Sequence, residues 1–158
     1  MGDLPTSLVL GRVIEAEIGD TGLRVRLKRL DRAQGIETDW VQVASPMVGP
    51  EAGLIFAPEP GDIAVMAYAA RRPLVLGFIT GADMPAPSDV LEERIIQSRN
   101  GNALVLIDGD EGGITLKDEH GNEITMNKDG ITLKSDADIT VEASGTATVK
   151  GATVELNP

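Results

Sequence analysis

The amino-acid sequence predicts an all-β protein in two parts, a small N-terminal barrel and a C-terminal prism built by three chains. Three observations predict this class. Short runs in which apolar and polar residues alternate recur along the 158 residues. All four aromatic residues precede residue 80, so the two halves differ in composition. The second half repeats Thr-centred apolar pairs about every eight residues, and a fixed period indicates a solenoid-like arrangement.

Composition narrows the possible functions. The net charge is -11, which argues against binding to a phosphate backbone. The chain contains no cysteine, and therefore no disulfide, thiol nucleophile or thiolate metal site. Its apolar runs are too short to span a bilayer. The N-terminal residues lack the pattern of a signal peptide, and we expect none.

The barrel prediction, for residues 1–80, comes from five short segments with strand patterns. In residues 23–29, Leu23, Val25 and Leu27 alternate with basic residues, which is typical of a half-buried strand. The other four segments are residues 8–18, 39–45, 61–68 and 73–79. Five short strands over about 70 residues predict a five-stranded barrel of the OB type.

The last two barrel strands are apolar on both faces. We expect Ile63 and Val65 to fill the barrel, which would leave Ala64, Met66 and Tyr68 pointing outward. A strand facing water should carry polar side chains there. Either local chain or another subunit would cover this face. Those three residues, together with Trp40, are the candidate residues for contact with another protein.

The strand at residues 23–29 also carries a basic stripe of Arg24, Arg26, Lys28 and Arg29. OB barrels often bind oligonucleotides through stacked aromatic residues in a positive groove. Because aromatic residues are few and the chain is acidic, a solvated strand face is the better interpretation, and we expect no nucleic-acid partner.

A linker is predicted over residues 81–93, which contain Pro85 and Pro87. Residues 94–158 then give eight short strand patterns separated by turns of Gly, Asp, Asn and Ser. The paired apolar positions are Ile114, Leu116, Ile124, Met126, Ile131, Leu133, Ile139, Val141, Ala147 and Val149.

Two inward side chains per strand bury too little surface to offset the ordering of the backbone, which costs about 1–2 kcal/mol per residue. Three chains wound about one axis would place six inward residues in each layer and pair the strand edges between chains. This arrangement predicts an intertwined triple-stranded β-helix, a trimeric prism with each strand of a chain on a different face. The alternative is a monomeric meander or sandwich.

No residue pattern indicates catalysis, and we expect no enzyme activity, cofactor or metal. The acidic turn with Asp108, Asp110 and Glu111 lacks the spacing of an EF-hand loop and is better explained as a solvated turn. The one histidine, His120, lies in a turn, where we expect it to point away from any symmetry axis.

The order of several motifs resembles the baseplate spike family, which includes the phage baseplate assembly protein V group and the similar spikes of type VI secretion and extracellular contractile injection systems. The matching motifs are Gly11-Arg12-Val13, Arg24-Val25-Arg26-Leu27, Trp40-Val41, Ala44-Ser45-Pro46, Pro60-Gly61-Asp62, Arg72-Pro73-Leu74-Val75-Leu76-Gly77 and the stretch from Arg99 to Met126. The resemblance covers roughly residues 8–150. It implies assembly in the cytoplasm into a phage tail or injection-system particle and a structural role at the leading tip of that particle.

The resemblance also implies partners. The OB barrel would attach to a baseplate hub protein, and the prism would contact and puncture the target envelope. Relatives that end bluntly carry a small conical tip protein of the Pro-Ala-Ala-Arg repeat type, which here would bind at Ala152, Val154 and Leu156. Two alternatives stay open: an OB-fold nucleic-acid module with a β-rich tail, and a trimeric fibre stem.

Overall fold

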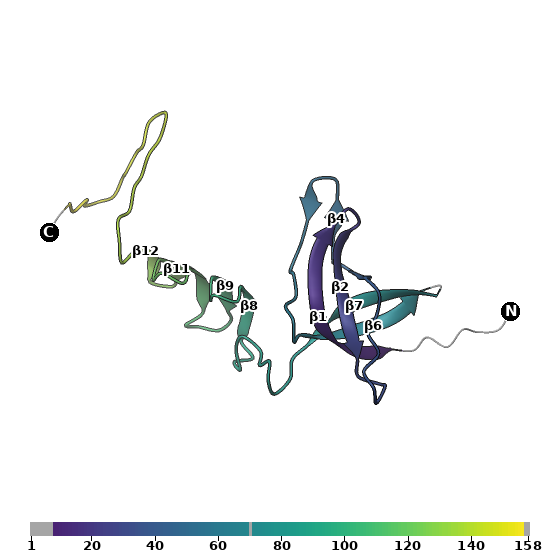
Figure 1. Cartoon of the computed structure of the whole chain (residues 1–158). Helices are drawn as coiled ribbons and strands as arrows, with labels where there is room; N and C mark the ends of the chain where they lie inside the picture. Colours follow the sequence, from purple (N-terminus) through teal and green to yellow (C-terminus); the bar gives the residue numbers. More distant parts are fainter. Residues whose placement is uncertain (1–7, 70, 157–158) are drawn as a thin grey trace. The chain divides into compact units, whose positions relative to one another are not determined.

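The structure, a computed structural model, describes residues 8–69 and 71–156. All regular secondary structure among these residues is β-strand, and Figure 1 shows the strands in two groups. The chain divides into two compact units between Ala86 and Pro87, a point inside the predicted linker. None of the described residues form a helix long and apolar enough to cross a membrane. The all-β class is therefore confirmed.

The N-terminal unit is a closed five-stranded barrel. Its strands are β1 (Val9–Gly19), β2 (Gly22–Arg29), β3 (Val41–Val43), β6 (Ile63–Ala69) and β7 (Arg72–Ile79). They follow the order β1-β2-β3-β7-β6, and β1 pairs with β6 to close the barrel. All neighbouring pairs are antiparallel except β3 and β7, which run parallel. The predicted OB-type barrel is confirmed.

Alternation within the strands places one set of aliphatic side chains inside. The buried cluster comprises Val9, Val13, Val25, Leu27, Val41, Ala64, Met66 and Val75. The register of β1 shifts between Val13 and Glu15, and that of β6 shifts between Val65 and Met66. Such bulges bend a strand and increase its twist, which a small barrel needs in order to close.

The predicted facing of β6 is wrong. Ala64 and Met66 lie inside the barrel with 0% exposure, and neither can meet another protein in the folded barrel. Ile63 and Val65 are instead the partly exposed residues of this strand. The sequence of β6 could not predict which side chains face inward, because both alternating sets are apolar. Pairing decides the facing: Met66 lies opposite the buried Val9 of β1.

The connection between β3 and β6 contains a small hairpin that the sequence patterns did not predict. It consists of β4 (Val48–Gly49) and β5 (Ala52–Gly53), with Glu51 at φ +54° in the turn. The Ser45 hydroxyl donates a hydrogen bond to the Leu54 carbonyl at 2.6 Å, which ties the base of the hairpin together.

The C-terminal unit contains a five-stranded antiparallel meander. Its strands are β8 (Glu93–Gln97), β9 (Ala103–Ile107), β10 (Gly113–Lys117), β11 (Glu123–Asn127) and β12 (Gly130–Lys134), each paired with its sequence neighbours. Connections this short join antiparallel neighbours. Gly113 permits a close strand approach, because a Cβ there would overlap the Met126 carbonyl.

Two expectations about this unit need correction. The strands of one chain do not lie on different faces of a prism over residues 93–134, because five consecutive strands share one sheet. The three further strands predicted after residue 134 are not formed within the single chain, since residues 135–156 contain no strand. A strand needs a hydrogen-bonded neighbour, and these residues have none in their own chain.

Replacement of the buried Met66 by alanine should destabilise the barrel by about 2–5 kcal/mol, because the substitution leaves a cavity in a closed core. The measurement is denaturant unfolding of the full chain. Leu76→Ala, on the neighbouring strand and 52% exposed, is the control and should cost much less. Equal losses for the two variants would contradict the observed facing.

Candidate assembly surfaces

One face of the β8–β12 sheet is aliphatic except for Arg94 of β8, which lies opposite Leu106 of β9. Strand register sets Leu104 of β9 opposite Leu116 of β10, which in turn faces Ile124 of β11 and then Leu133 of β12. A second row runs parallel to it. The aliphatic face is formed by Ile96, Leu104, Leu106, Ile114, Leu116, Ile124, Met126, Ile131 and Leu133.

This aliphatic face is open to solvent in the single chain. Ile131 is 75% exposed and Leu133 is 55% exposed. Exposed apolar surface of this extent marks an interaction site. Six of the predicted prism-core residues, from Ile114 to Leu133, lie on it. Their burial between chains stays a prediction.

The opposite face of the same sheet is polar over β10–β12, whereas on β8 and β9 it carries Ile95 and the buried Ala103 and Val105. Thr115, Thr125 and Thr132 form one cross-strand row, and the Thr125 hydroxyl donates a hydrogen bond to Glu123 at 2.6 Å. A second row sets Glu123 between Lys117 and Lys134, so that opposite charges alternate across three strands. The sheet is therefore amphipathic, and its aliphatic side is the one that requires a partner.

Residues 135–156 carry the remaining predicted prism-core and tip residues, and many of their apolar side chains are exposed. The large exposed ones are Ile139, Val141, Val149, Val154 and Leu156. Ala147 and Ala152 are exposed as well. No strand or ladder within the chain brings these positions together, so their predicted role also stays a prediction.

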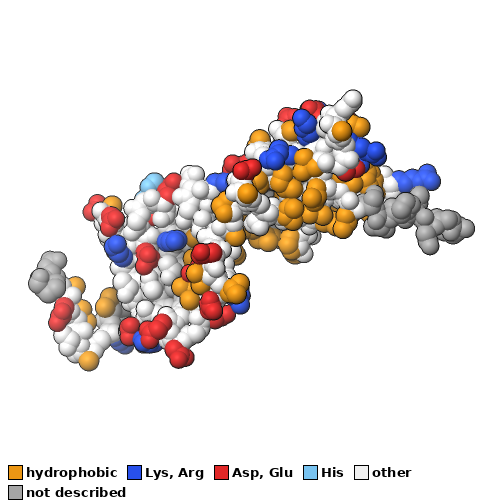
Figure 2. All heavy atoms as spheres, turned by 90° about the horizontal axis from the view of Figure 1, so that it is seen from below, with side chains coloured by type: hydrophobic (Ala, Val, Ile, Leu, Met, Phe, Trp, Pro, Cys, Tyr) orange, Lys and Arg blue, Asp and Glu red, His pale blue; other side chains and the backbone are white. Residues whose placement is uncertain are grey.

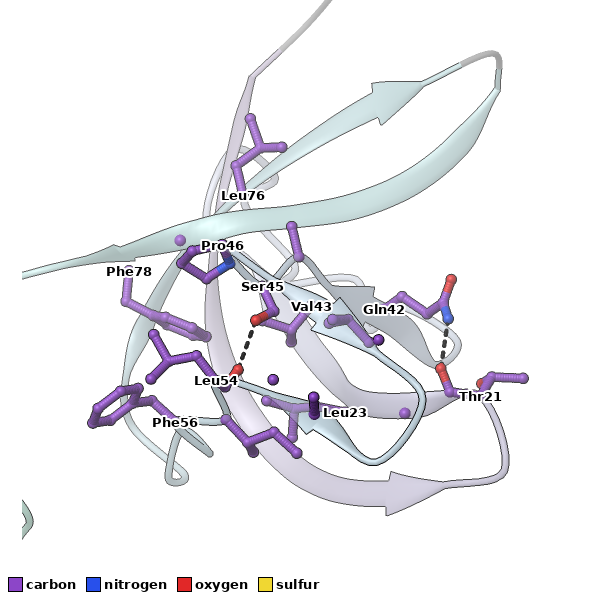
Figure 3. A pocket seen from close by; sticks show the side chains of 18 of the residues that line it. Thr21, Leu23, Gln42, Val43, Ser45, Pro46, Leu54, Phe56, Leu76 and Phe78 are labelled. Atoms are coloured by element: carbon purple, nitrogen blue, oxygen red, sulfur yellow. Dashed lines mark hydrogen bonds between the residues drawn. The ribbon is translucent and has the colours of Figure 1, made fainter.

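The barrel has an apolar pocket of about 890 Å³ between its wall and the β3–β6 connection. Leu54, Phe56 and Phe78 gather on one side of it, near Leu23 and Val43 (Figure 3). The lining includes Ser45, whose hydroxyl is engaged with backbone carbonyls, and no histidine that could activate it. The pocket therefore lacks the groups for nucleophilic catalysis.

Hydrophobic side chains also gather in a broad patch over the barrel on the face shown in Figure 2. Apolar side chains that gather in one patch mark a surface for contact with another molecule. The barrel, like the C-terminal sheet, therefore offers apolar surface for contact with another chain.

The basic stripe on β2 is largely neutralised by neighbouring carboxylates. Arg24 pairs with Glu17 of β1, and its guanidinium lies 5.1 Å from the Trp40 ring centroid. Arg26 pairs with Glu15 at 3.3 Å and with Glu37 at 2.9 Å. A stripe whose guanidiniums are already paired is a poor phosphate-binding groove.

Of the four residues predicted to contact another protein, Trp40 and Tyr68 keep that role as a prediction. Tyr68 is partly buried against the barrel core, and its hydroxyl accepts a hydrogen bond from Arg29 at 3.4 Å. Trp40 is partly exposed beside Arg24. No hydrogen bond or ring contact joins Trp40 to Tyr68, and the other two candidates, Ala64 and Met66 of β6, are core residues.

In the acidic turns, a carboxylate accepts hydrogen bonds from backbone amides. Asp118 accepts hydrogen bonds from the amides of His120 and Asn122, at 2.8 and 2.9 Å, and from the Asn122 side chain at 2.7 Å. These donors, the Asn122 side chain above all, hold the pKa of Asp118 below its usual range. Among the described residues, no group of three or more His, Cys, Asp or Glu side chains is arranged to hold a metal ion.

Two family models match the chain. Residues 9–79 match the OB domain of the type VI secretion system/phage-baseplate injector. Residues 93–158 match the C-terminal trimerisation domain of phage baseplate V. The chain belongs to the baseplate spike family. No curated protein sequence matches the chain.

Membership in the baseplate spike family accounts for both units. The N-terminal match coincides with the closed barrel, and the C-terminal match begins at the first strand of the amphipathic sheet. The family's domains indicate a structural, spike-type role in the baseplate of a phage tail or injection particle. The trimerisation domain supports a homotrimer, in which the aliphatic face would have its partners.

Charge placed on the aliphatic face should prevent assembly. Ile131→Asp would bring three carboxylates together in a trimer, and an unpaired buried charge costs several kcal/mol. Asp129→Asn, in the adjacent turn, is the matched control and should leave assembly unchanged. Light scattering coupled to size exclusion gives the mass of each variant. Equal assembly of both variants would show that this face is not the trimer interface.

Proposed function

We propose that the protein is the central spike of a contractile tail or injection-system baseplate and that three copies assemble about one axis. The observation that carries this proposal is the exposed aliphatic face of β8–β12, which lies in the segment that matches a trimerisation domain. Burial of a leucine or isoleucine side chain contributes about 1.5–3 kcal/mol relative to full exposure. Three such faces turned toward a common axis would remove all of them from water.

The antiparallel meander supports a specific arrangement of the prism. Each chain would supply one sheet as one side of a triangular prism, with the aliphatic face inward and the threonine and charged rows outward. Four strand-to-strand steps at about 4.8 Å give this section a length of about 19 Å. The inward rows would still meet six to a layer, with two side chains from each chain.

Residues 135–156 would continue the prism by pairing between chains. They lack strand partners in their own chain, yet they retain the alternation of apolar and polar residues, as in Ile139, Val141 and Val149. In the proposed trimer, the neighbouring chains supply those partners. The intertwined section would begin near Ser135, immediately after β12.

The proposed mechanism is mechanical. The barrel would attach the spike to a baseplate hub, and the prism would point at the target envelope and puncture it when the sheath contracts. A prism whose strand edges are paired between chains offers no open edge at which it could shear apart. No catalytic group is required for this role, which agrees with the structural character of the matched families.

The mass of the purified protein tests the proposal. Light scattering coupled to size exclusion should give about three times the 16.6 kDa of one chain. A monomer at micromolar concentration would overturn the trimeric spike. A monomer that also binds oligonucleotides, with affinity falling as salt rises, would favour a nucleic-acid module instead.

Residues 152–156 should bind a separate conical tip protein. Ala152, Val154 and Leu156 are exposed apolar side chains, and in a trimer three copies of them would offer an apolar surface to another chain. Residues 157 and 158 lie outside the described residues.

Deletion of residues 152–158 should abolish binding of the tip protein, measured by pull-down with the purified tip protein of the same particle, and should leave a trimer by mass. A control variant, Asp129→Asn, should bind normally. Full binding by the truncated chain would contradict the proposal.

A further inference from the structure

One end of the barrel is cationic although the whole chain is acidic. Four arginines belong to this end: Arg29 at the end of β2, Arg32 in the loop that follows, and Arg71 and Arg72 at the turn between β6 and β7. We call this group the basic end. It is a separate feature from the paired stripe of Arg24 and Arg26.

Contacts within the barrel place these arginines at the same end. The Arg29 guanidinium donates a hydrogen bond to the Tyr68 hydroxyl at 3.4 Å, and Ala69, the next residue of β6, lies opposite Arg72 of β7. Leu30 also donates its amide to the Leu10 carbonyl at 2.9 Å, which holds the end of β2 against the start of β1.

The basic end lies away from the connection to the C-terminal unit. Strand β7 begins at Arg72 and ends at Ile79, from which the chain continues into the linker. Seven steps at about 3.3 Å separate the two ends of this strand by about 23 Å. A partner bound at the basic end would therefore meet the barrel at the opposite end of β7 from the linker.

The positive charge of this end is only partly balanced. Asp31 pairs with both Arg29, at 2.7 Å, and Arg32, at 3.7 Å, so one carboxylate serves two guanidiniums. The Arg29 guanidinium, through its hydrogen bonds, holds the pKa of Asp31 below its usual range. No ion pair among the described residues involves Arg71 or Arg72. Four guanidiniums against one carboxylate leave a local charge of +3 on a chain of net charge -11.

The surroundings of these charges are typical of a protein interface. Leu8 is 64% exposed and Leu30 is 48% exposed beside them. Arginine is enriched in the centres of protein interfaces, where its planar guanidinium binds carboxylates in a bidentate manner. Arg71 adopts φ +71°, a conformation that glycine would adopt at lower cost, so this turn contains a charged side chain in spite of backbone strain.

We propose that the basic end is the surface by which the barrel docks on its hub, and that the facing surface of the hub is rich in carboxylates. This inference rests on the proposed attachment of the barrel to a hub and adds the residues and the chemistry of the contact. A trimer presents three basic ends. A carboxylate ring with three-fold symmetry would match them, and long-range attraction would speed their encounter.

A nucleic acid is the less suitable occupant. Stacking of bases requires exposed aromatic faces. The aromatic residue at this end, Tyr68, is partly buried against the barrel core and bonded to Arg29. Exposed leucines beside the arginines match a protein surface better than a phosphate backbone.

The test compares the full-length double variant R71E/R72E with the wild type for binding to the purified hub protein of the same particle. The expected result is a loss of affinity of at least tenfold, with the loss largest at low salt, because repulsion replaces attraction. The control is the double variant K128E/K150E, which makes the same charge change on exposed residues of the C-terminal unit and should bind like the wild type. Light scattering and a melting curve establish that all three proteins are folded trimers.

The outcomes separate this inference from the proposed function. A wild-type trimer that binds the hub with an affinity equal to that of R71E/R72E overturns the basic end alone. A wild-type protein that fails to bind the hub overturns the attachment itself and this inference with it. Equal losses in R71E/R72E and K128E/K150E would reveal a general charge effect and also overturn it. A single-stranded oligonucleotide that binds the wild type and not R71E/R72E would assign this end to nucleic acid instead.

Discussion

The structure depends on one constraint, which is that the described residues of the C-terminal unit form one sheet without a second layer of strands or helices over it. A sheet with one apolar face must bury that face against another element. Here Leu116, Ile131 and Leu133 are half exposed or more. Other copies of the chain would supply a covering surface, and the match to a trimerisation domain agrees with this geometry.

The barrel also has to bury one face of a sheet, but it does so within a single chain. Its sheet closes on itself through the pairing of β1 with β6, and the two faces of the sheet become an inside and an outside. Val25, Leu27 and Met66 are then fully buried without any partner chain. Closure also removes the open strand edges that would otherwise pair with other molecules. The barrel core is therefore buried within a single chain, while the aliphatic face of the C-terminal unit is exposed in a single chain.

Strand positions and the closed barrel could be predicted from the sequence, because alternation and turn residues are local signals. The facing of β6 could not, since Ala64 and Met66 are as apolar as Ile63 and Val65, and only the pairing with Val9 decides between them. The β4–β5 hairpin was missed because strands of two residues show no alternation. The meander could have been predicted from the short loops, because such loops favour antiparallel pairing within a chain over strands on separate faces of a prism.

The candidate surfaces were harder to predict than the fold for a related reason. An aliphatic face is visible in the sequence as a repeat, and six of its residues were found in this way. The basic end gathers Arg29, Arg32 and Arg71 from segments about forty residues apart, so only the closed barrel brings them together.

The net charge of -11 says less about function than the composition alone suggests. Carboxylates such as Asp118 accept hydrogen bonds from backbone amides in the turns of the C-terminal sheet, and others such as Glu17 pair with arginines of the barrel. Once these carboxylates are assigned to structural roles, the arginines without such partners become the more informative charges. If the barrel docks through its basic end, as we propose, this separation of charges would leave the arginines free for the partner.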